Sequence, residues 1–190
     1  MFVINKENKL RHKPDAEITI SGNIKVIGKA AFLKHQELKK VTISEGVVAI
    51  ENQAFQGCSS LQELILPNTL ESIGVQSFYG CPKLKKLIIP EGTTQIGDEA
   101  FLSCCSLEEL FIPKSLKTLG KSAFFMCGQL HTIWIPKEST FKDAILETFS
   151  YHIHKASWIV DEFSVTKEEL EVAKMRDPIE NYGHITVNLY

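Results

Sequence analysis

The stretch Ile96–Pro113, which reads IGDEAFLSCCSLEELFIP, carries the pattern that decides the fold. It contains an Ala-Phe pair, a Cys three residues after the Phe, and apolar residues six, nine and eleven residues after it. Equivalent stretches occur along the chain, because a Phe recurs every 23 residues. The recurring residues are Phe32, Phe55, Phe78, Phe101 and Phe124.

Other positions recur in the same phase. The residues three after each Phe are His35, Cys58, Cys81, Cys104 and Cys127. Those six after it are Leu38, Leu61, Leu84, Leu107 and Leu130. A single unit with this pattern cannot bury its own apolar side, so repeated units stack and bury a continuous core. The sequence therefore predicts a solenoid.

Each repeat predicts the same local structure. The stretch L-x-x-L-x-I alternates as a short strand does, and the proline that follows it ends the strand. The stretch A-F-x-x-C-x-x-L has apolar residues at three-residue spacing, which predicts a short helical or 3₁₀ turn. Each repeat is thus expected to contain one strand and one helical turn.

The repeated pattern I-G-x-x-A-F-x-x-C-x-x-L-x-x-L-x-I-P, over about residues 16–136, resembles the BspA-like class of bacterial leucine-rich repeats. The resemblance implies an α/β solenoid, a right-handed superhelix with a parallel concave β-sheet and short helical or 3₁₀ turns on its convex side. It also implies a binding role rather than catalysis. Many proteins of that class are secreted or surface-exposed.

The ends of the chain depart from the repeat and are expected to cap it. The predicted divisions are an N-terminal cap, the repeats, a degenerate last repeat and a C-terminal cap: residues 1–15, 16–136, 137–161 and 162–190. The last repeat is degenerate because Phe149 follows Phe124 by 25 residues. In the C-terminal cap, Thr166 and Glu169 form a capping box that predicts a helix near 166–175. Alternation at Ile185, Val187 and Leu189 predicts a final strand.

One outward-facing position of the predicted sheet is apolar. Neighbouring side chains of a strand face opposite sides, so the residue ten after each Phe points out of the sheet. Thr19 and Thr42 are polar there, and the family pattern usually carries such a small polar residue. The five residues that follow are apolar: Ile65, Ile88, Phe111, Trp134 and Ile159. Rungs ~4.8 Å apart would align them in a strip ~19 Å long, and exposed apolar patches mark interaction sites.

Charged residues flank this predicted strip two positions earlier. They alternate in sign from repeat to repeat: Glu17, Lys40, Glu63, Lys86 and Glu109. Opposite charges on neighbouring strands stabilise each other, so one interpretation is a self-paired ladder. The other is that Lys40, Glu63, Lys86 and Glu109 form the polar rim of a binding site. His131 is expected near the same surface.

The remaining chemistry is sparse. The four cysteines at 23-residue spacing follow the repeat, not the close pairs of a zinc site, so we expect a buried ladder, with Cys105 outward. His152 and His154 lie two residues apart, but no third metal ligand is specified. No phosphate-binding, nucleophile-elbow or H-E-x-x-H motif occurs. We therefore expect no enzyme, no cofactor and no metal. The net charge of −2 indicates neither a nucleic-acid nor a membrane partner.

The predicted function is non-catalytic protein binding through the strip, as an intracellular adaptor or inhibitor. Two alternatives involve the same surface: a homodimer joined through it, or a C-terminal tail folded over it. A further alternative is a secreted or surface protein that binds a host. Residues 1–16 lack the apolar core of a secretory signal, which predicts a cytoplasmic location.

Overall fold

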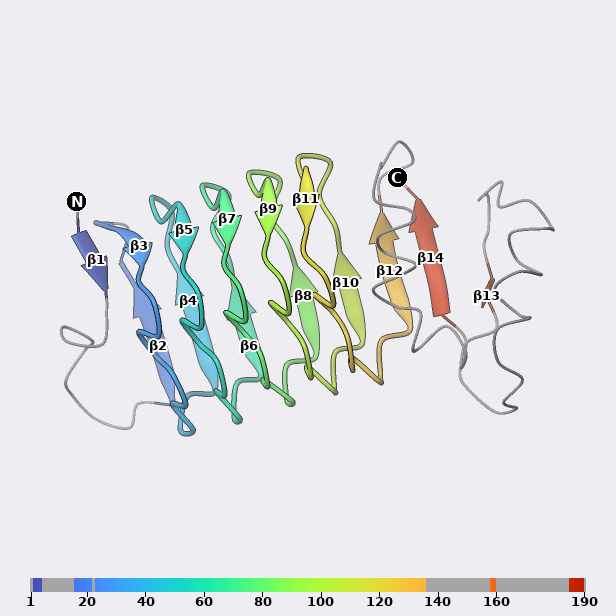
Figure 1. Ribbon diagram of the computed structural model, residues 1–190, viewed down its shortest axis with the longest axis horizontal. Helices are drawn as coiled ribbons and strands as arrows, with labels where there is room; N and C mark the ends of the chain where they lie inside the picture. Colours follow the sequence, from blue (N-terminus) through green and yellow to red (C-terminus); the bar gives the residue numbers. More distant parts are fainter. Residues whose placement is uncertain (1, 5–15, 22, 136–157, 160–184, 190) are drawn as a thin grey trace.

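The protein is a stack of β rungs with two layers of parallel strands, as the computed structural model in Figure 1 shows. The structure describes residues 2–4, 16–21, 23–135, 158–159 and 185–189. Each described repeat contributes one strand to each layer, so the two layers enclose the apolar core between them. The parallel solenoid that the 23-residue period predicts is confirmed.

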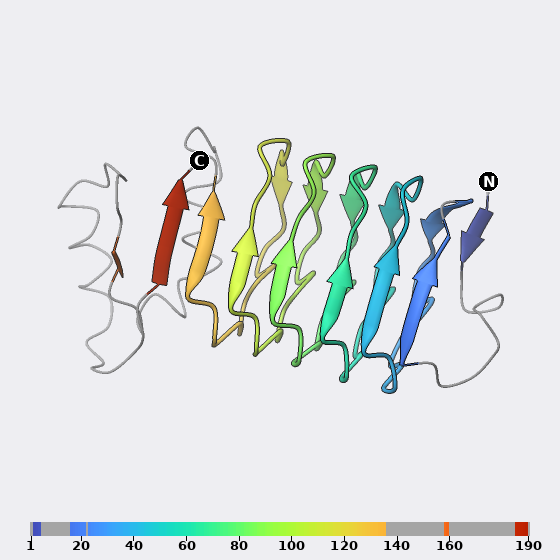
Figure 2. The same cartoon turned by 180° about the vertical axis from the view of Figure 1, so that it is seen from behind.

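The first layer, which we name the long-strand face, contains the strands that the L-x-x-L-x-I stretches predict (Figure 2). It consists of a sheet ordered β2-β4-β6 and a sheet ordered β8-β10-β12-β14-β13. Its strands are β2 Glu17–Ile20, β4 Lys40–Ile43, β6 Glu63–Ile65, β8 Lys86–Ile88, β10 Glu109–Phe111, β12 Thr132–Ile135, β13 Trp158–Ile159 and β14 Ile185–Leu189. Strands β6 and β8 lie side by side without ladder pairing, which divides this face into two sheets.

The second layer is a six-stranded parallel sheet that the sequence pattern did not predict. Its order is β1-β3-β5-β7-β9-β11, and most of its strands are two residues long. The strands are β1 Phe2–Ile4, β3 Ile24–Ile27, β5 Ala49–Ile50, β7 Ser72–Ile73, β9 Gln95–Ile96 and β11 Thr118–Leu119. From β3 onward, each strand ends on the apolar residue that precedes a repeat Phe by five, which is buried in β3, β5, β7 and β9.

The predicted helical or 3₁₀ turns are not confirmed, because the described residues form no helix around the Ala-Phe pairs. Two residues of each repeat have left-handed φ angles, for example Gln53 (61°) and Gly57 (72°) on either side of Phe55. A left-handed residue every four positions prevents a continuous right-handed helix. The chain instead makes consecutive tight turns, and the Phe55 amide donates to the Ser77 carbonyl of the next repeat at 2.7 Å.

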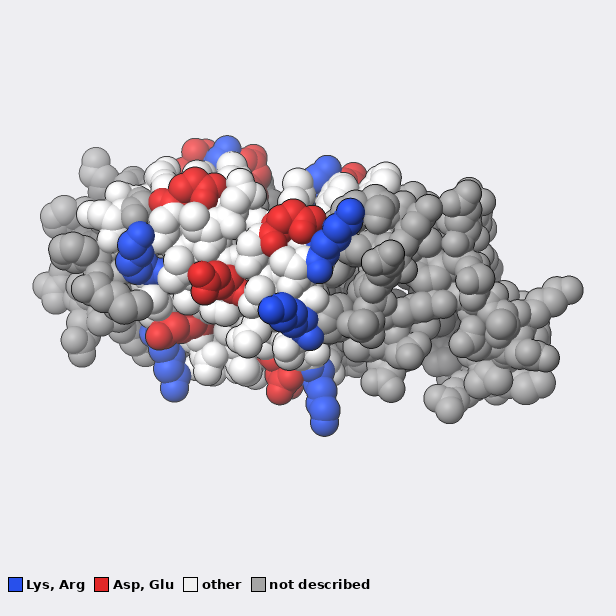
Figure 3. All heavy atoms as spheres, turned by 90° about the horizontal axis from the view of Figure 1, so that it is seen from above, with Lys and Arg blue, Asp and Glu red and all other residues white. Residues whose placement is uncertain are grey.

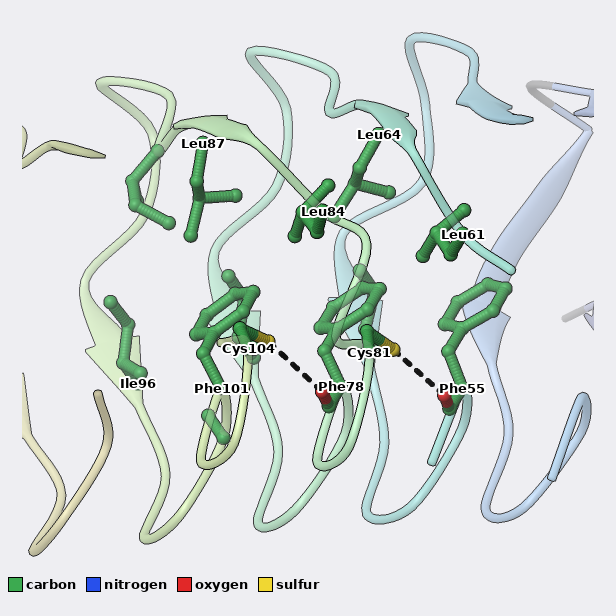
Figure 4. Packing of buried hydrophobic residues seen from close by; sticks show 14 of the residues in the cluster. Phe55, Leu61, Leu64, Phe78, Cys81, Leu84, Leu87, Ile96, Phe101 and Cys104 are labelled. Atoms are coloured by element: carbon green, nitrogen blue, oxygen red, sulfur yellow. Dashed lines mark hydrogen bonds between the residues drawn. The ribbon is translucent and has the colours of Figure 1, made fainter. Parts of the chain in front are cut away.

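The core is a set of columns in which equivalent residues stack along the solenoid axis (Figure 4). The rings of the five repeat phenylalanines lie 4.9–5.3 Å apart, centroid to centroid, and within 5° of parallel. Each is buried, and full burial of one such side chain removes about 150–250 Å² of surface from water. The repeat phase of the sequence therefore corresponds directly to the packing of the core.

At the C-terminal end, β14 lies between β12 and β13, out of chain order (Figure 2). Ile133 pairs with Val187 and Ile135 with Leu189, so β14 is in register with β12 along its length. The predicted final strand is confirmed, but it takes the rung expected for the degenerate last repeat. The predicted helix at 166–175 and the histidines at 152 and 154 lie outside the described residues.

Candidate protein-binding face

Four of the five predicted strip residues lie side by side on the long-strand face. Ile65 and Ile88 are 48% and 55% exposed, the most exposed large apolar side chains of the described chain. Phe111 pairs in register with Ile88 on one side and with Trp134 on the other. The Phe111 and Trp134 rings stack at 5.3 Å, nearly parallel at 5°, and are half-buried. We name Ile65, Ile88, Phe111 and Trp134 the apolar strip.

Ile159 does not continue the apolar strip, and its predicted place is wrong. It pairs with Thr186, which pairs with Thr132, so Ile159 lies at the level of the charged position. The physical reason is that β14 occupies the rung beside β12 and shifts β13 one rung outward. Asn188 instead pairs with Trp134. With Thr42 paired to Ile65 at the other end, the strip is four rungs long and bounded by polar residues at both ends.

The charged residues of this face are paired with one another. Lys40 lies 2.6 Å from Glu63 and Lys86 lies 2.7 Å from Glu109, each pair joining neighbouring rungs. The hydrogen bond and the charge of Glu63 raise the pKa of Lys40. These contacts match the self-paired ladder interpretation, and such exposed pairs stabilise a fold only weakly. They leave the face close to electrically neutral.

Two contacts on this face were not apparent from the sequence pattern. The ammonium of Lys86 lies 5.2 Å from the centroid of the Phe111 ring, a cation–π distance that links the charged ladder to the apolar strip. His131 is exposed, and its Nδ1 lies 2.9 Å from Thr132 Oγ1, at the start of β12. In the view from above, acidic and basic side chains of the described residues are interspersed and do not form a patch of one sign (Figure 3).

The four repeat cysteines are buried, as their spacing predicts. Each thiol donates to the carbonyl of a Phe of the preceding repeat, for example Cys81 Sγ to Phe55 O at 3.5 Å (Figure 4). Burial raises the pKa of Cys58 to about 12 and the pKa of Cys104 well above its ordinary value. These thiols are therefore protonated and unreactive at neutral pH. Cys105 is exposed and its thiol donates to Ser103 O, at 3.5 Å.

The part of the chain that the structure describes contains no cluster of three or more His, Cys, Asp or Glu side chains that could hold a metal ion. None of its segments is a helix long and apolar enough to span a bilayer.

Comparison with known families identifies the repeat. Residues 25–153 match the BspA type leucine rich repeat region in 6 copies, so the chain belongs to that family. Proteins of this family are generally protein-interaction modules without catalytic activity, and the relatives found here are bacterial. A comparison with curated proteins finds no match.

Solved structures show the same fold. A leucine-rich repeat protein from Bacteroides ovatus is 42% identical, with 64% of this chain and 31% of that chain covered and a TM-score of 0.59. A leucine rich cell surface protein from Faecalibacterium prausnitzii is 32% identical, with 73% and 37% covered and a TM-score of 0.64. The pneumococcal vaccine antigen PcpA is 25% identical, with 90% and 41% covered and a TM-score of 0.64. This chain spans about a third of the length of the first two relatives.

These comparisons contradict the predicted cytoplasmic location. One of the relatives is a cell surface protein and another is a vaccine antigen, so membership of this family does not indicate a cytoplasmic protein. The prediction was based only on the composition of residues 1–16, and the comparisons overturn it.

Proposed function

We propose that this chain is a non-catalytic protein-binding module of a surface or secreted bacterial protein, and that it binds a partner protein through the apolar strip. The observation that carries the proposal is the exposure of Ile65 and Ile88 beside the stacked pair of Phe111 and Trp134. Exposed contiguous apolar patches on soluble proteins mark interaction sites, and Trp and Phe are frequent anchors of interfaces.

The charges around the strip define the kind of partner surface that fits. Lys40 is paired with Glu63 and Lys86 with Glu109, so the face presents little net charge to a partner. Binding therefore depends on apolar contact rather than on charge attraction. We expect the affinity to change little between low and high salt, unlike that of interfaces assembled by electrostatic steering.

The strip can be tested without disturbing the core. Thr replaces Ile well in this column, because Thr19 and Thr42 occupy the same position in the first two rungs. The strip variant is Ile65→Thr/Ile88→Thr. The matched control is Val75→Thr/Met126→Ser, which removes two apolar residues of similar exposure (38% and 46%) that lie outside the strands of the long-strand face. Ser is used at position 126 because Met126 has a left-handed φ of 61°, and Ser103 occupies the equivalent position of the preceding repeat with a φ of 62°.

The measurement is affinity capture by immobilised wild type, strip variant and control variant from bacterial and host cell-surface protein extracts, at low and high salt. We expect the same proteins on wild type and control, and their loss from the strip variant. Equal capture by all three proteins would show that the strip is not the binding site. Circular dichroism of each variant confirms that the fold is retained.

A further inference from the structure

The apolar strip and the charges beside it are arranged so that the surface is complementary to a second copy of itself. The inference rests on the proposed function, because it names the partner of the same site. Two features of the long-strand face are combined: the number of rungs in the strip and the alternation of charge beside it. Both are properties of β4, β6, β8, β10 and β12, whose order and register the structure gives.

The strip contains an even number of rungs. Ile65, Ile88, Phe111 and Trp134 lie on β6, β8, β10 and β12, and Thr42 and Asn188 bound them. The midpoint of a four-rung strip falls between rungs, here between β8 and β10. A two-fold axis parallel to the strands through this midpoint would place a second copy face to face, with β8 opposite the other copy's β10 and β6 opposite its β12.

The charges distinguish an axis between two rungs from an axis that passes through a rung. Beside the strip the sign alternates from rung to rung along Lys40, Glu63, Lys86 and Glu109. A two-fold axis on a rung would oppose like charges, because rungs equally distant from it carry the same sign. An axis between β8 and β10 opposes Lys86 to Glu109 of the second copy, and Glu109 to its Lys86. The two intrachain pairs then join in a four-charge cluster in which all neighbours have opposite signs.

The apolar residues match about the same axis. Ile88 would face Phe111 of the second copy, and Ile65 would face its Trp134. The polar ends would also meet, since Thr42 on β4 is opposite the rung that carries Asn188. The charge alternation excludes an axis on a rung, and the midpoint of the apolar strip selects the axis between β8 and β10 from those that lie between rungs. We propose that the long-strand face binds a second copy of this chain, antiparallel along the solenoid axis, about a two-fold axis between β8 and β10.

The size of the strip predicts a weak dimer. Four rungs span three spacings of ~4.8 Å, which is ~14 Å. Two aromatic and two aliphatic side chains supply well under the ~800 Å² that each partner contributes to a standard stable interface. We therefore expect association in the micromolar range or weaker, visible as a mass that rises with concentration. In such an interface the charges mainly fix the register.

A charge exchange between two variants tests the register. The Lys86→Glu variant places a carboxylate opposite Glu109 of a second copy, and the Glu109→Lys variant places an ammonium opposite its Lys86. Each variant alone should dimerise at least ~10-fold more weakly than wild type, since like charges across an interface are unfavourable. An equimolar mixture restores opposite charges at both contacts, so it should form a heterodimer of near wild-type affinity. Sedimentation equilibrium over a concentration series measures each association constant.

Lys40→Glu is the matched control. It breaks an equivalent intrachain pair, the one with Glu63, but about the proposed axis this position faces the uncharged rung of β14. Its dimerisation should equal that of wild type. A marked loss for Lys40→Glu would place the axis elsewhere and overturn the proposal.

Other results separate the dimer from the proposed function. A wild type that stays monomeric at the highest concentration overturns the dimer, while strip-dependent capture of other proteins would still support the binding module. A dimer that persists in Ile65→Thr/Ile88→Thr, or a mixture of the charge variants that fails to associate, also overturns the proposed geometry. Loss of dimerisation in the strip variant, together with rescue by mixing, is the supporting result.

Discussion

Alkaline pH should destabilise this protein through its buried cysteine column. Cys58, Cys81, Cys104 and Cys127 are buried, and burial raises the pKa of Cys58 to about 12 from an ordinary 9.0. The folded protein keeps these protons above pH 9, whereas the unfolded chain releases them. The unfolded state then binds fewer protons than the folded state, so the free energy of unfolding falls as pH rises.

The magnitude follows from the shift. At about pH 10, roughly one unit above the ordinary thiol pKa, ionisation stabilises the unfolded chain by about 1.4 kcal/mol for each buried thiol. The four buried thiols together give about 6 kcal/mol, a large part of the roughly 5–15 kcal/mol that stabilises a typical domain. The loss should begin near the ordinary thiol pKa of 9.0 and continue to about 12, where Cys58 ionises in the folded protein.

Urea unfolding followed by circular dichroism under reducing conditions, from about pH 7 to about pH 10, measures this effect. Cys104→Ala removes one buried thiol and should reduce the cysteine-dependent loss by about a quarter, whatever its own cavity costs at neutral pH. Cys105→Ala is the control, because Cys105 is exposed in the folded protein and does not belong to the buried cysteine column. A pH dependence unchanged by Cys104→Ala, or reduced equally by Cys105→Ala, would refute the reasoning.

Three further predictions concern single positions of the repeat. Ser77 is buried and its hydroxyl has no hydrogen-bond partner, and most repeats have Ala at this position. Ser77→Ala should therefore raise the free energy of unfolding by about 1 kcal/mol. A lower free energy of unfolding for this variant in urea would contradict the prediction. Phe78→Ala leaves a cavity between two stacked rings and should lower the free energy of unfolding by about 3–5 kcal/mol in the same assay. A decrease below about 1 kcal/mol would argue against the stacked Phe column. Among the described cysteines, native protein should react with maleimide at Cys105 alone, as mass spectrometry of peptides would show; rapid labelling of Cys104 would contradict its burial.

The sequence predicted those features that recur with the repeat. The strands of the long-strand face, the stacked Phe column and the buried cysteines follow from apolar residues 23 positions apart, because stacking places equivalent residues in contact. The alternation of Lys40, Glu63, Lys86 and Glu109 likewise predicted the ion pairs, since parallel in-register strands bring equivalent positions together.

The features that the sequence did not predict depend on backbone angles or on distant pairing. The turns were mistaken for helical ones because left-handed residues such as Gln53, Gln76 and Glu99 are not glycines and give no local signal. The place of Ile159 was wrong because a distant segment, residues 185–189, has the same alternating pattern and pairs with β12 instead. Alternation predicts a strand but does not specify its neighbour.

The most direct test of the central claim is the ratio of protein retained by immobilised Ile65→Thr/Ile88→Thr to that retained by Val75→Thr/Met126→Ser. Both variants lose two exposed apolar side chains, but only the first loses residues of the apolar strip. The account predicts a ratio near zero, with the control variant equal to wild type. A ratio near one would contradict the claim that the apolar strip is the binding surface.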